Sequence, residues 1–144
     1  MIARISRTLA LGAVLLAAGC NSLGGVPEFK MAGIAPQPLH PGDTALITVA
    51  VKDRNNIINS ITGVIREEPT IKLTLRDDGT EGDVKAGDGV WSLAVRVPLE
   101  APPGVFNLTF TAYRSDGVAV PIRGEGGEIH PLAVEMPLSI QYKQ

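Results

Sequence analysis

Apolar and polar residues alternate with a period of two along most of the chain from residue 44 onward, and this limits the fold more than any other feature. A period of two puts apolar side chains on one face of a β-strand, whereas a helix needs a period near 3.6. The alternation predicts clear strands at 44–52, 70–76, 90–97, 105–113 and 132–142, and weaker strands at 57–66 and 118–122. No stretch after residue 20 has the helical period, so we expect an all-β domain.

Turn-forming residues separate these strands at short intervals. Segments rich in Gly, Pro, Asn, Asp and Glu occur at 53–56, 67–69, 77–89, 102–104, 115–117 and 124–127. Seven or eight short strands with such turns predict an antiparallel β-sandwich, with an immunoglobulin-like arrangement expected before a barrel. Pro121, Pro131 and Pro137 indicate that the last strands lie at a sheet edge or are interrupted, because proline has no N–H to donate.

The first nineteen residues have the order of a secretory signal. Arg4 and Arg7 give a short basic region, an apolar run follows at 9–18, and small residues stand at 17–19. The apolar run is too short to span a bilayer. We therefore expect residues 1–19 to be a signal peptide that is removed.

The signal ends at Cys20, the only cysteine of the chain, within the sequence LAAGC. This sequence resembles the lipobox of bacterial lipoproteins, although the family favours leucine where this chain has Ala17. The resemblance implies cleavage before Cys20, a diacylglyceryl group on its thiol, and an acyl chain such as palmitate on the new amino group. It also implies outer-membrane sorting in a Gram-negative host, since Asn21 and not Asp follows the cysteine. The alternative is an ordinary signal peptide followed by a chance cysteine, which would be a liability in an exported protein.

The region after Cys20 is rich in glycine and proline, with Gly24-Gly25 and prolines at 27, 36, 38 and 41. Such a composition excludes a continuous helix and favours a flexible tether. We expect a lipidated cysteine and linker over 20–38 and an immunoglobulin-like domain over 39–144. A first edge strand is an alternative for 34–39, because proline is tolerated there.

The most distinctive internal segment is the acidic, glycine-rich loop at 77–89. It resembles a signature of bacterial extracellular immunoglobulin-like domains, some of them known as choice-of-anchor X domains, of the form DDGxxGDxxAGDGx[YW]. The matching residues are Asp77, Asp78, Gly79, Gly82, Asp83, Ala86, Gly87, Asp88, Gly89 and Trp91. The resemblance implies an accessory or adhesive module of secreted and surface proteins, and it implies no reaction.

Two physical interpretations of this loop stay open. Aspartates accept hydrogen bonds from backbone N–H groups two residues on, and glycines supply positive φ, so turn chemistry alone can fold the loop. Carboxylates are also the ligands that Ca²⁺ prefers, and Asp77, Asp78, Asp83 and Asp88 can supply them for a structural calcium ion. The loop does not follow the EF-hand template, because Gly79 stands at its third position and the flanking segments are strands.

Composition and motifs bound the function. A formal net charge of −2 leaves no electrostatic footprint for nucleic acid. His40 and His130 each precede a proline, and the sequence has no GxSxG, HExxH or phosphate-loop motif. Glu67-Glu68 is the one adjacent carboxylate pair to consider for glycoside hydrolysis, and without a cleft it is a weak basis for it.

We therefore expect no enzyme and no cofactor beyond the calcium considered above. The expected function is a binding or structural module anchored to the membrane through its N-terminal lipid. Its partner would be an envelope protein, a glycan or a second copy of the chain. An accessory subunit of an envelope or secretion assembly is the alternative, and a small exported hydrolase is the least favoured.

Overall fold

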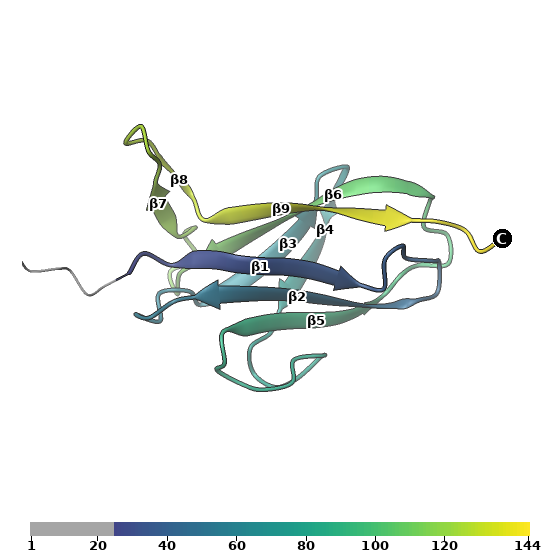
Figure 1. Cartoon of the computed structure of the whole chain (residues 1–144), viewed down its shortest axis with the longest axis horizontal. Coiled ribbons are helices and arrows are strands. Elements are labelled where there is room, and N and C mark those ends of the chain that lie inside the picture. The colour runs from purple at the N-terminus through teal and green to yellow at the C-terminus, as the bar shows by residue number, and fades with distance from the viewer. Residues whose placement is uncertain (1–24) are drawn as a thin grey trace, which may run out of the picture.

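The computed structural model describes residues 25–144, in which two antiparallel β-sheets face each other (Figure 1). The first sheet has the order β1-β2-β5, formed by β1 (Glu28–Ala35), β2 (Thr44–Lys52) and β5 (Val90–Arg96). The second has the order β4-β3-β6-β9, formed by β3 (Ser60–Ile65), β4 (Glu68–Leu75), β6 (Gly104–Tyr113) and β9 (Ala133–Ile140). A separate hairpin pairs β7 (Pro121–Arg123) with β8 (Ile129–Pro131). The predicted all-β, immunoglobulin-like sandwich is confirmed.

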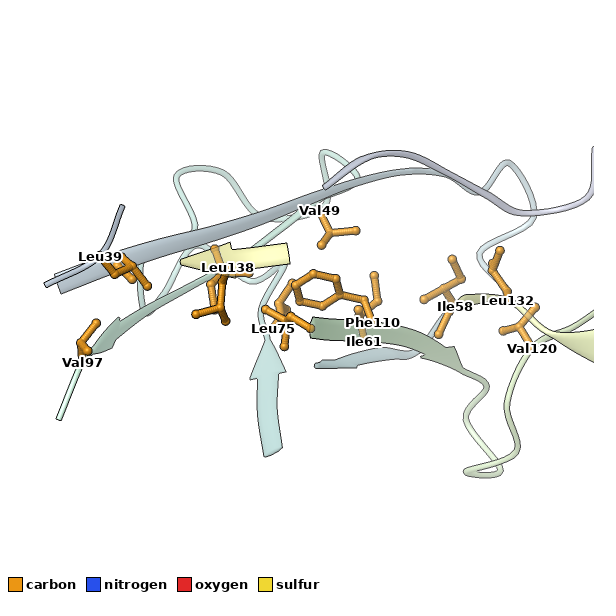
Figure 2. Packing of buried hydrophobic residues seen from close by; sticks show 14 of the residues in the cluster. Leu39, Val49, Ile58, Ile61, Leu75, Val97, Phe110, Val120, Leu132 and Leu138 are labelled. Atoms are coloured by element: carbon orange, nitrogen blue, oxygen red, sulfur yellow. The ribbon is translucent and has the colours of Figure 1, made fainter. Parts of the chain in front are cut away.

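The core lies between the two sheets, where the alternating apolar residues meet (Figure 2). On β2, Ala45, Ile47 and Val49 are at most 1% exposed, and on β6 Leu108 and Phe110 are fully buried. Burying each of the larger side chains contributes about 1.5–3 kcal/mol. Within the described residues, every strand and the whole buried cluster come from residues 28–140, so this part of the chain supplies its own hydrophobic core.

Strand β1 lies within the segment expected to be a linker, so the sheet begins at Glu28 and the expected linker over 20–38 is too long. A β-bulge between Phe29 and Met31 shifts the register on β2. The bulge explains why the sequence pattern does not indicate a strand here. Phe29 faces the core before the bulge, and Ala32 and Ile34 face it afterwards. The apolar residues therefore change parity, and no unbroken alternation is visible.

After β1 the chain crosses from the first sheet to the second. Leu39 forms an isolated parallel bridge with Ile140 of β9, in which its N–H donates to the Ser139 carbonyl at 2.8 Å. The N–H of Gln141 donates to the Leu39 carbonyl at the same distance. One side of the sandwich is therefore joined by hydrogen bonds between the two sheets.

Two expected strands also differ from the structure, and one observed strand was not expected. Residues 57–59 precede β3 instead of belonging to it, because the Asp53 carboxylate accepts the N–H groups of Ile57 at 3.0 Å and Ile58 at 2.8 Å. The strand expected at 118–122 is reduced to β7, and β8 was not expected. Strand β9 lies at the outer edge of its sheet and contains Pro137, as the prolines predicted. No helix in residues 25–144 is long and apolar enough to cross a membrane.

Candidate functional site

The acidic loop carries the chain from β4 in the second sheet to β5 in the first. Its two ends are joined, because Arg76 and Ser92 exchange two backbone hydrogen bonds of 2.8 Å. Farther along the loop, the Glu81 carbonyl accepts the N–H of Ala94 at 2.7 Å. Since β5 is an edge strand of its sheet, the loop occupies backbone groups that would otherwise be open to a second chain.

Gly82 is the residue that allows this close approach. Its φ is +100°, and an added Cβ would lie 2.9 Å from the Ala94 nitrogen and 3.0 Å from a methyl group of Leu46. A side chain at this position is therefore excluded both by the backbone conformation and by the neighbouring strand. The glycine at position 82 of the loop is therefore explained by its close contact with β5 and β2.

Three of the four predicted aspartates converge in this loop. Asp77, Asp83 and Asp88 each offer a carboxylate oxygen, and these oxygens all lie within 4.8 Å of one another. Asp83 is buried, with 6% of its surface exposed. Asp78 points elsewhere, because it accepts hydrogen bonds from the Thr80 backbone and hydroxyl and lies 3.6 Å from the Arg76 guanidinium. The calcium hypothesis therefore narrows to three carboxylates and stays a prediction.

The same carboxylates also make the hydrogen bonds expected of turn chemistry. Asp83 accepts the N–H of Gly79 at 2.7 Å, and Asp88 accepts that of Val90 at 2.9 Å. Asp77 accepts from Asp88 at 3.2 Å and from Gly89 at 3.3 Å. Each converging aspartate therefore binds loop backbone without any ion.

The surroundings of Asp77 disfavour its ionised form. Burial raises the pKa of the Asp77 carboxyl, and the nearby charge of Asp83 raises it further. The N–H groups of Gly89, Asp88 and Gly87 oppose this shift by stabilising the ionised form, without cancelling it. The raised pKa of Asp77 therefore reflects its partial burial first and its closeness to Asp83 second.

A polar hollow of about 320 Å³ lies between this loop and the turn that follows β2. Arg54 and Asn56 line it from the turn, Asp77 and Asp88 from the acidic loop, and Trp91 from β5. The sequence marked 53–56 only as a turn, so these two residues were not expected beside the aspartates. The one feature of the sequence that could have indicated their position is that this turn directly follows a clearly predicted strand.

The remaining candidate residues do not belong to the acidic loop. Cys20 lies outside the described residues. His40 Nδ1 lies 3.1 Å from the Asp43 carboxylate in the turn before β2, whereas His130 is on β8. Glu67 and Glu68 have separate partners: Glu67 accepts from the backbone and side chain of Asn107, both at 2.9 Å, and Glu68 accepts from the Thr70 hydroxyl.

Comparison with known proteins gives distant similarity in structure alone. No family model and no curated protein matches the chain. An endo-beta-1,4-mannanase from Thermotoga petrophila aligns with 88% of this chain and 22% of its own, at 10% identity and a TM-score of 0.48. The chain thus spans about a fifth of the mannanase. A Niemann-Pick type C2 protein from the Japanese carpenter ant aligns with 82% of this chain and 95% of its own, at 10% identity and a TM-score of 0.44.

Proposed function

We propose that the chain is a lipid-anchored protein of the bacterial cell envelope whose β-sandwich is a non-catalytic binding or structural module. The observation that carries the proposal is the sequence LAAGC at the end of an export signal, with Cys20 as the only cysteine. Two or three acyl chains at this residue give durable attachment, whereas one chain gives only marginal binding. In a Gram-negative host, Asn21 directs the protein to the outer membrane.

The start of β1 supports a short connection to the anchor. Glu28 follows Cys20 by eight residues, which span at most about 28 Å when fully extended. The first sheet therefore begins close to the membrane surface. Because Glu28 pairs with Lys52, the turn after β2 and the polar hollow beside it lie at this same end of the sandwich.

The opposite end of the sandwich is then directed away from the membrane. It carries the turn between β3 and β4, the segment 97–103 and the C-terminal residues (Figure 1). A protein or glycan partner in the envelope meets this end first. The alternative is that the chain is an accessory subunit of an envelope or secretion assembly.

Metabolic labelling tests the anchor. Cells expressing the chain are grown with an alkyne analogue of palmitate, and the labelled protein is detected after coupling to a fluorophore. The wild type and the control Ser22→Ala should incorporate the label, because both keep the cysteine. Cys20→Ser should incorporate none. Equal labelling of Cys20→Ser, or no labelling of the wild type, would overturn the proposal.

A further inference from the structure

The two sheets do not close against each other along the whole β4–β5 side. They are joined by the Arg76–Ser92 bridge at one end of these strands. At the other end, Ile71 is 41% exposed, although it alternates in phase with Leu75, which is 2% exposed. An inward-facing isoleucine is therefore left uncovered between the sheets.

A cavity of about 650 Å³ opens at this place. Its apolar walls come from the second sheet and from the segment after β5, and they include Ile65, Ile71, Ala101, Phe106 and Ile140. A second space of about 160 Å³ shares several of these residues and continues inward to the core residues Leu39, Ala45 and Ile47. The exposed side chain of Arg96 also borders this inner space. The two spaces together form a narrowing apolar cleft of the size that binds small ligands.

The mouth of the outer cavity has the opposite character. Three exposed glutamates, Glu67, Glu68 and Glu100, line it, and among residues 25–144 no lysine, arginine or histidine does. Glu67 is held by the backbone and side chain of Asn107, which fixes the β3–β4 turn to β6 beside the mouth. An apolar interior under a rim of carboxylates matches a ligand with an apolar tail and a positively charged head.

We infer that this cleft binds a single-chain amphiphile with a hydrocarbon tail and a cationic amine head. The tail lies against Ile71 and Phe106 and removes their exposed surface from water. The amine lies among the carboxylates of the mouth. The site does not depend on the lipid anchor, because it lies at the end of the sandwich opposite to Glu28.

Binding is measured with the chain from residue 20 onward, carrying Cys20→Ser so that no acyl group is attached. This chain contains every strand and the whole buried cluster that the structure describes. N-Phenyl-1-naphthylamine, a neutral apolar dye, should become fluorescent on entering the cleft. Dodecylamine should displace it at a concentration about fivefold lower than dodecanoate, the scale of a few solvent-screened charge pairs.

Two substitutions to arginine separate the cleft from the rest of the surface. Ile71→Arg places a charge on the apolar wall of the cleft and should weaken dye binding by at least about tenfold, because a charge does not enter an apolar site without cost. Ile129→Arg, at an exposed position on β8, is the matched control and should leave binding unchanged. Ile71→Trp fills the same space without a charge. It takes the place of Ile71→Arg in the comparison with Ile129→Arg if Ile71→Arg does not fold.

The charged rim has its own test. The double substitution Glu68→Gln and Glu100→Gln should retain dye binding and bring dodecylamine and dodecanoate to similar displacing concentrations. The inference is overturned if the dye stays dark, if dodecanoate displaces as well as dodecylamine, or if Ile71→Arg and Ile129→Arg behave alike. It is also overturned if the wild type binds no dye and sediments as a dimer that Ile71→Arg dissociates. A second copy of the chain then covers the cleft.

Discussion

Gly63 of β3 lies directly opposite Phe110 of β6, and the phenyl ring covers the glycine. The two residues are paired in register, and Phe110 is fully buried. A Cβ added to Gly63 would lie 2.9 Å from Phe110 Cε1 and 3.3 Å from Leu108 Cδ1. The ring fills the space that a side chain on β3 would otherwise occupy, so the glycine and the phenylalanine form one packing unit at the centre of the core.

Gly63→Ala is therefore expected to destabilise the domain by about 1–3 kcal/mol, the usual cost of overpacking a dense core. Gly33→Ala is the matched control, because Gly33 also lies in a strand and an added Cβ there meets nothing within 4 Å. Urea unfolding of the two variants measures the difference. Equal stability of the two variants would show that the Phe110 ring moves aside without cost.

Acid should weaken the domain partly through Glu67. The backbone N–H of Asn107 donates to its carboxylate and lowers the pKa of Glu67 below the ordinary value of 4.5, with a further contribution from the Asn107 side chain. The ionised form is thus favoured in the folded state. Its stabilisation is present above the ordinary pKa and is lost as the pH falls through the lower, folded value.

Glu67→Gln is consequently expected to reduce the loss of melting temperature between about pH 6 and about pH 3. Asn107→Ala removes the side-chain donor and keeps the backbone N–H, so it should give an intermediate pH dependence. Calorimetry across this range measures both effects. A pH profile of Glu67→Gln that parallels the wild type would show that the Asn107 contact does not stabilise the ionised carboxylate.

The calcium hypothesis makes a prediction that depends on where Asp78 points. Calcium should raise the melting temperature of the wild type and of Asp78→Asn, because Asp78 is bound to Thr80 and lies apart from the cluster. Asp83→Asn and Asp88→Asn should lose the rise. The measurement is differential scanning calorimetry with and without Ca²⁺, together with a heat titration. No heat and no rise in the wild type would leave turn chemistry as the whole explanation of the loop.

The strands that sequence predicts best are those whose alternation is unbroken. Residues 44–52 form β2 with the expected face buried, because Ala45, Ile47 and Val49 face the second sheet. Strand β1 escaped prediction because its bulge changes the parity between Phe29 and Ala32. Residues 57–59 were wrongly included in a strand, because the Asp53 carboxylate takes N–H groups that a neighbouring strand would otherwise bind.

The acidic loop was predictable as a unit but not in its internal arrangement. Its glycines and aspartates indicated a tight loop, and the structure explains Gly82 by its contact with Ala94. The sequence did not distinguish Asp78 from the other three aspartates, because that difference depends on which way each side chain leaves the backbone. The apolar cleft gave no signal either, since Ile71 continues the same alternation as the buried Leu75.

Intact-mass spectrometry of the protein extracted from host membranes tests the central claim most directly. The account predicts a chain that begins at Cys20 and carries the added mass of a diacylglyceryl group, with an amide-linked acyl chain where the host supplies one. Fragmentation should place this mass on residue 20. A chain that begins at any other residue, or that retains Cys20 as a free thiol, would contradict the account.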